Sequence, residues 1–133
     1  MIKNKFLKIL SFFIFPFIVF MIHMVFAFYG VYITFTWLDI PMHFLGGLAI
    51  SYTIVLFLKF FKDKNMINIR NRFIFVLVVV ALVILVAVLW EFYEFFLKTF
   101  FNVSTQPNLE DTLLDLFMGL VGGLFGGIVF RRI

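Results

Sequence analysis

The stretch PNLEDTLLDLFMGLVGGLFGGIVF, residues 107–130, decides how this chain folds. From Leu109 onward it is long and apolar enough for a helix that crosses a bilayer, which takes about 20 residues. Its glycines form two rows with a spacing of four residues: Gly119, Gly123 and Gly127, and Gly122 and Gly126. Small residues at this spacing let membrane helices approach closely. The stretch therefore predicts a tightly packed transmembrane helix, whose glycines serve either packing inside one bundle or contact in a homo-oligomer.

The composition of the whole chain is that of a membrane protein. Of its 133 residues, 65% are hydrophobic and 14% are charged. A soluble globular chain is roughly half apolar and a quarter charged. The chain has no cysteine, which excludes disulfides, thiolate metal sites and thiol redox motifs. Its length suits a single integral membrane domain over residues 1–133.

Three further apolar stretches are long enough to span a bilayer, so we predict an all-α polytopic membrane protein with a bundle of four transmembrane helices. The predicted helices are residues 6–28, 41–61, 73–101 and 109–130. The first follows MIKNK, which looks like the start of a signal peptide, but its apolar run is too long for one and no cleavage pattern follows. Pro16, inside this helix, is expected to kink it.

The basic residues predict the orientation of these helices. Ten of the eleven lie at one set of helix ends: Lys3, Lys5, Lys8, Lys59, Lys62, Lys64, Arg70, Arg72, Arg131 and Arg132. Aromatic residues that favour a membrane interface lie at the opposite ends: Tyr29, Tyr32, Trp37, Trp90 and Tyr93. The positive-inside rule places both termini in the cytoplasm. The net charge of +4 is thus mainly a topology signal, and no nucleic-acid partner is expected beside the lipid bilayer.

The acidic residues gather at the extracytoplasmic ends of the predicted helices. Six of the seven lie there, on three separate segments: Asp39, Glu91, Glu94, Glu110, Asp111 and Asp115. Spacings of three or four residues place Glu91 with Glu94, Asp111 with Asp115, and Asp39 with His43 on shared helix faces. Ionisable groups at membrane depth usually face the bundle interior. The sequence therefore predicts a carboxylate–His cluster at the extracytoplasmic interface.

A cluster of carboxylates needs a bound cation, shared protons or basic partners. Basic partners are scarce, since Lys98 is the one lysine or arginine predicted on that side. Carboxylates with imidazole suit a divalent ion such as Mg, Mn, Ca or Zn, and a metal-bound water could attack a substrate. The candidate metal ligands are Asp39, His43, Glu91 and Asp115. Glu94 and Asp111 are the candidate general bases.

Structural roles compete for the same residues. Asn108 followed by Asp111 resembles a helix capping box, and acids in a first turn suit the helix dipole. Asp39 lies where a helix begins, and His43 and His23 could each form a hydrogen bond between helices. The chain has no zinc-protease motif, nucleophile elbow, phosphate-binding loop or dinucleotide fingerprint. Whether the protein is an enzyme therefore stays open at the level of sequence.

Three blocks resemble a known family: DIPMHFLGG (39–47), LWEFYEFF (89–96) and EDTLLDLFMGLVGG (110–123). They are similar to the YjdF-like bacterial inner-membrane proteins, with Asp-x3-His-Phe, a Glu pair on one helix, and Asp-Thr-x2-Asp before a small-residue helix. The resemblance implies a multi-pass protein of unassigned activity in the cytoplasmic (inner) membrane of a prokaryote. It points to the residues Asp39, His43, Glu91, Glu94, Asp111 and Asp115. A looser resemblance is to the VanZ-like proteins, linked to glycopeptide resistance. The chain departs from those at Glu94, where they usually have Gln.

Several functions fit these observations. The first is a cation-binding membrane protein that acts on a lipid or envelope substrate. The alternatives are a VanZ-like envelope or antibiotic-resistance factor, a small proton-coupled transporter, and a non-catalytic membrane scaffold. A transporter needs a polar path across the bilayer, and the cytoplasmic halves of the predicted helices have few polar residues beyond Ser51 and Thr53.

Overall fold

A computed structural model describes residues 9–101 and 108–132, and the regular elements in these ranges are all helices. They are α2 (Ile14–Phe28), α3 (Val31–Thr34), the 3-10 helix η1 (Thr36–Leu38), α4 (Asp39–Asp63), α5 (Arg72–Phe101), α6 (Leu109–Val129) and the 3-10 helix η2 (Phe130–Arg132). The predicted all-α class is confirmed.

Local sequence explains where the long helices begin. The side chain of Asn108 accepts a hydrogen bond from the backbone N–H of Asp111 at 3.0 Å, which caps α6 as its sequence predicts. Asn71 caps α5 in the same way, with its Oδ1 2.8 Å from the backbone nitrogen of Phe73. Gly30, with a φ of 66°, adopts the left-handed conformation that follows many helix ends and turns the chain after α2.

Helix α4 begins at Asp39, two residues earlier than predicted. Pro41 then lies in the first turn, where a backbone N–H has no partner within the helix and its absence is tolerated. Asp39 and His43 are therefore both helical and one turn apart, which is the condition for them to share a face.

The structure corrects the number of predicted transmembrane helices from four to three. The helical segments long and apolar enough to cross a membrane, among the residues described, are Thr36–Asp63, Arg72–Phe101 and Leu109–Arg132. The first predicted helix, over residues 6–28, contains α2, which has 15 residues and is shorter than a span needs. Residues 1–8 of the chain lie outside the described ranges.

Pro16 is the physical reason for the short α2. Because proline has no N–H, Pro16 cannot bond to the carbonyl oxygen of Phe12, four residues before it. The chain turns at this point, and α2 begins at Ile14 with Pro16 in its first turn. The carbonyl oxygen of Phe12 instead accepts a hydrogen bond from Thr53 Oγ1 of α4 at 2.7 Å. Pro16 thus starts a new helix rather than kinking a continuous one.

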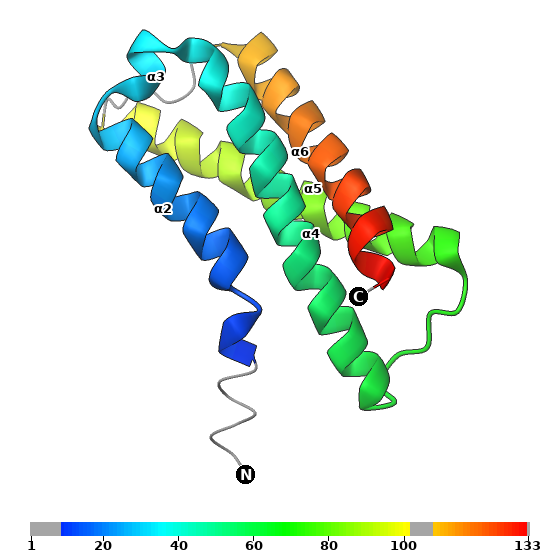
Figure 1. The fold of residues 1–133 in the computed structure, drawn as a ribbon. Helices are drawn as coiled ribbons and strands as arrows, with labels where there is room; N and C mark the ends of the chain where they lie inside the picture. Colours follow the sequence, from blue (N-terminus) through cyan, green and yellow to red (C-terminus); the bar gives the residue numbers. More distant parts are fainter. Residues whose placement is uncertain (1–8, 102–107, 133) are drawn as a thin grey trace.

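The long helices meet in a fixed order. Helices α4 and α6 lie side by side, α2 packs on the other side of α4, and α5 crosses behind them (Figure 1). Helices α4 and α6 begin, and α5 ends, at the end of the bundle where Asp39, Glu94 and Asp115 lie, which we call the acidic end. The opposite end, with Lys59 and Arg131, is the basic end.

Glycines bring α6 close to its neighbours within the chain. All five glycines of α6 are buried. A Cβ atom on Gly122 would clash with the carbonyl oxygen of Phe44 on α4, and one on Gly123 would clash with Val83 on α5. The glycine rows are therefore used inside the bundle, and the homo-oligomer predicted through this helix is not supported.

Candidate functional site

Three helices bring five titratable side chains together at the acidic end. Helix α4 contributes Asp39 and His43, α5 contributes Glu91 and Glu94, and α6 contributes Asp115. We call these five residues the carboxylate–His cluster. The members on one helix are three or four residues apart, so each pair lies on one face of its helix.

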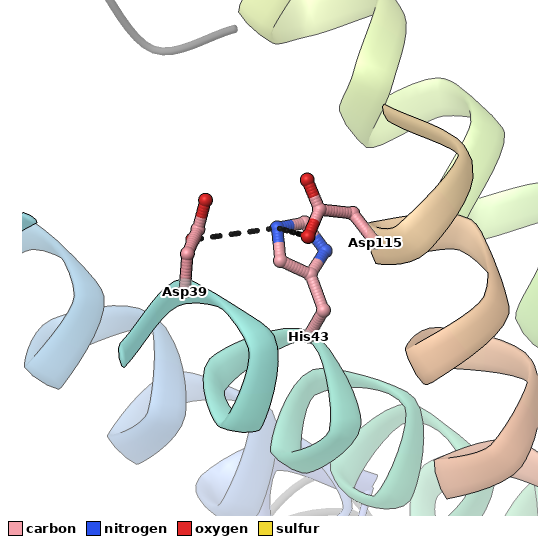
Figure 2. A group of neighbouring side chains, drawn as sticks. All are labelled: Asp39, His43 and Asp115. Carbon is pink, nitrogen blue, oxygen red and sulfur yellow. Dashed lines mark ion pairs between the residues drawn. The ribbon is translucent and has the colours of Figure 1, made fainter. Parts of the chain in front are cut away.

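His43 lies between two carboxylates that come from different helices (Figure 2). Its Nε2 is 3.5 Å from Oδ1 of Asp39 on the same helix and 3.7 Å from Oδ1 of Asp115 on α6. Both distances exceed the roughly 2.7–3.2 Å of a direct N–H···O hydrogen bond. The three side chains point toward one another with room between their polar atoms.

His43 also faces the two glutamates of α5. One nitrogen or oxygen atom each from His43, Glu91 and Glu94 lies within 4.8 Å of the other two, and the same holds for Asp39, His43 and Asp115. Two donors that bind one ion at about 2.0–2.6 Å lie about 3–5 Å apart. Either group therefore has a spacing that a single cation can bridge, and His43 belongs to both.

The cluster is buried at its inner side and open at its outer side. Asp115, Glu94 and Glu91 are only 2%, 3% and 7% exposed, whereas the side chain of Asp39 is 21% exposed. Removing a carboxylate from water is unfavourable unless another charge or several hydrogen bonds compensate for it. A small cation would supply that compensation and would reach the cluster past Asp39.

Aromatic residues hold one glutamate and a second histidine beside the cluster. Trp90 Nε1 donates a hydrogen bond to Glu94 Oε1 at 3.0 Å, and the ring of His23 lies edge-on to Trp90. His23 Nδ1 is 2.9 Å from the hydroxyl of Tyr32, and burial raises the pKa of that hydroxyl, which stays protonated. The observed contact of His23 is therefore the structural one, a hydrogen bond to Tyr32 of α3.

Trp90 and Tyr32 were predicted to be interfacial aromatic residues and not parts of the site. The spacing of four residues between Trp90 and Glu94 is the signal that could have indicated their contact. No comparable signal connects His23 with Tyr32, because the turn at Gly30 folds α3 back against α2.

Two acidic residues of α6 lie apart from the cluster. Glu110 is exposed, and Asp111 is partly buried one turn before Asp115. Neither belongs to a candidate metal group among the residues that the structure describes. The backbone N–H of Asp111 is held by the cap at Asn108, so its observed role is at the helix start. Five of the six predicted site residues thus converge, and Asp111 remains at the mouth of the site.

The donor set has a recognisable chemistry. Four carboxylates and one imidazole are donors for hard or borderline divalent ions, with carboxylate oxygen suited to Mg, Ca and Mn and imidazole to Zn. The oxygen-rich composition favours the first three. The set contains no thiolate and does not resemble a closed structural zinc site.

Comparison with known proteins supports membrane location and assigns no activity. A family model described as "Predicted membrane protein (DUF2238)" matches residues 2–133. This is the YjdF family, so the match is consistent with the closer of the two sequence resemblances, and similarity to VanZ-like proteins is not shown. No curated protein and no solved structure matches the chain.

Proposed function

From the premise that this chain belongs to the DUF2238 family of predicted membrane proteins, we propose that it binds a divalent cation in its carboxylate–His cluster. The observation that carries the proposal is the position of His43, which shares one candidate metal group with Asp39 and Asp115 and another with Glu91 and Glu94. An ion in the first group would be held by α4 and α6, and an ion in the second group by α4 and α5.

The charges of the cluster support this proposal. Four carboxylates surround a single imidazole, and three of them are almost wholly buried. One imidazolium could balance at most one carboxylate, whereas a divalent ion balances two and accepts oxygen donors from the others. Mg, Mn or Ca fits the oxygen-rich set better than Zn.

We place the site at the extracytoplasmic face of a prokaryotic inner membrane, with the end of α6 in the cytoplasm. The support is the distribution of cations. Lys59, Lys62, Arg70 and Arg131 line one pocket at the basic end, opposite the cluster. Such an excess of lysine and arginine is typical of the cytoplasmic side.

As an enzyme, the protein would act on a lipid or envelope substrate at this interface. A bound divalent ion supplies activation of water and stabilisation of developing negative charge. Asp39, His43 and Asp115 form one candidate group for the ion, and Glu91, which shares the second group with His43, would be a further ligand. Glu94, oriented by Trp90, would take the proton from the attacking water, and Asp111 at the mouth is the second candidate for that role.

The contacts of the helix interiors disfavour a transporter. Ser51 Oγ donates to the carbonyl oxygen of Leu48 at 2.6 Å, and Thr53 Oγ1 donates to that of Phe12 at 2.7 Å. Both hydroxyls therefore serve the backbone and offer no chain of polar groups toward the basic end. The alternative is a scaffold, in which the cluster only joins helices. Metal content distinguishes such a scaffold from a cation site.

The test is the metal content of the detergent-purified protein. We expect about one divalent ion per chain in the wild type. His43→Ala and Asp115→Asn should each lose the ion, because each removes a proposed ligand. Glu110→Gln, which changes an exposed acid outside the cluster, is the matched control and should keep the ion. A folded wild type without metal, and without a thermal shift in Mg, Mn, Ca or Zn, would leave the scaffold as the better account.

A further inference from the structure

An apolar cavity lies directly beneath the carboxylate–His cluster. Its volume is about 210 Å³, and helices α2, α4, α5 and α6 all contribute to its wall. The apolar wall includes Val19, Phe20, Met42, Ile50, Val83 and Val86. His43 belongs both to this wall and to the cluster, so the apolar and polar spaces adjoin.

The shape and lining of the cavity suit a hydrocarbon chain. From His43 to Ile50 the wall extends about 10 Å along α4, at 1.5 Å per residue. Pockets for whole drug-sized ligands are larger, about 300–1,000 Å³. The cavity therefore has room for part of one chain and not for a complete lipid. The polar groups of its wall, His23, His43 and Trp90, all come from the level nearest the acidic end.

Gly46 indicates that the space is a feature of the fold. A Cβ atom on Gly47 would clash with the carbonyl oxygen of Gly119, so close packing of α4 on α6 accounts for that glycine. A Cβ atom on Gly46 would meet no atom within 4 Å, and packing gives no reason for a glycine there. Gly46 lies in the cavity wall, one turn below His43, where any side chain would reduce the space.

We propose that this cavity binds the hydrocarbon chain of a membrane lipid whose phosphate headgroup reaches the cation at His43. Without a cation, the carboxylates would repel a phosphate, so the headgroup part of this inference rests on the proposed function. The chain part rests on the cavity alone. A lipid held in this way has its phosphate beside Glu94 and Asp115, which is the position that a substrate of the proposed site must occupy.

The cavity contains its own fluorescent reporter. Trp90 lines the cavity, whereas Trp37, the other of the two tryptophans, is 62% exposed and does not line it. In a Trp37→Phe background, dibromostearoyl phosphatidic acid is titrated into the protein in a bromine-free detergent. Bromine quenches tryptophan at short range, so we expect quenching of Trp90 that saturates at a single lipid per chain. Quenching that rises without saturation, as in simple partitioning into micelles, would overturn the chain site.

Two leucine substitutions form a matched pair. Gly46→Leu extends into the cavity, and we expect it to abolish saturable quenching while the thermal unfolding midpoint stays at or above that of the parent. Ala81→Leu adds the same side chain on an exposed face of α5 and should leave quenching unchanged. If Gly46→Leu bound the brominated lipid as well as Ala81→Leu, the cavity would not be the binding site.

A second lipid separates the chain site from the cation site. Dibromostearoyl diacylglycerol has the same chains without the phosphate, so its quenching should not depend on metal. Asp115→Asn, which we expect to lose the ion, should weaken phosphatidic acid binding by about tenfold or more, because the phosphate loses its charge-assisted contact with the cation, and leave diacylglycerol binding unchanged. Saturable quenching by both lipids in a protein that binds no metal would refute the cation and keep the chain site. Bound metal with unsaturable quenching would keep the cation site and refute the chain site.

Discussion

At the scale of single residues, two side chains connect parts of the chain that are far apart in sequence. His43 shares one candidate metal group with carboxylates of α4 and α6 and another with carboxylates of α5. Thr53 donates a hydrogen bond to the carbonyl oxygen of Phe12, 41 residues earlier, which Pro16 leaves without its usual helical partner. In both cases a polar group finds an interaction partner on another helix.

The contact of Thr53 leads to a prediction about stability. Thr53→Val keeps the size of the side chain but removes the donor, and we expect it to lower the free energy of unfolding by about 1–2 kcal/mol, the upper part of the range for hydrogen bonds between membrane helices. Thr53→Ser keeps the hydroxyl and should lose less. Equal unfolding midpoints of the two variants in detergent would show that the hydrogen bond contributes nothing.

At the scale of helices, close approach of backbones determines which glycines are needed. Gly47 and Gly122 lie where α4 and α6 touch, and an added methyl group at either position would strike a carbonyl oxygen of the other helix. Gly46, on the same helix as Gly47 and next to it, faces the open cavity. Gly46 can therefore be replaced by a residue with a side chain, whereas its neighbour Gly47 cannot.

We predict opposite effects of the same substitution at these two neighbours. Gly47→Ala should destabilise the protein by about 1–3 kcal/mol, as overpacking of an interior usually does. Gly46→Ala meets no atom and replaces a poor helix former, so it should stabilise the protein by up to about 1 kcal/mol. Thermal unfolding in detergent measures both, and a destabilised Gly46→Ala would mean that the space beside it is filled.

At the scale of the whole molecule, charge is divided between the two ends of the bundle. The carboxylate–His cluster lies at one end, while Lys59, Lys62, Arg70 and Arg131 surround a pocket of about 320 Å³ at the other. Within residues 9–101 and 108–132, three candidate spans connect these ends. Helix α2, about 22 Å long at 1.5 Å per residue, is shorter than the roughly 30 Å hydrocarbon core.

The division of charge predicts the orientation in the membrane. Because the chain has no cysteine, a single introduced cysteine can be labelled without background. Asn68→Cys, exposed near the basic end, should react with a membrane-impermeant maleimide only in inverted vesicles. Glu110→Cys, exposed at the acidic end, should react in intact cells after removal of any outer barrier. The reversed pattern would place the carboxylate–His cluster on the cytoplasmic side.

The amino-acid sequence by itself determined those properties that are local along the chain. Hydropathy predicted an all-helical membrane protein, and spacings of three and four residues paired Asp39 with His43 and Glu91 with Glu94 on single helices. The cap at Asn108 was also predictable, since it involves residues three apart. The spacing therefore predicted two pairs that the structure also brings together, and it gave no geometry that joined one pair to the other.

Only the tertiary structure decided how the helices meet. The rotation of each helix about its axis brings His43 to Asp115 and to Glu94, and it turns one glycine row toward α4 and the other toward α5. The crossing of α2, α4 and α5 leaves the cavity below His43. Thr53 of α4 donates a hydrogen bond to the Phe12 carbonyl oxygen, next to the helix break before Pro16. Periodicity shows which residues share a face, but the relative rotation of packed helices depends on the side chains of both partners at once.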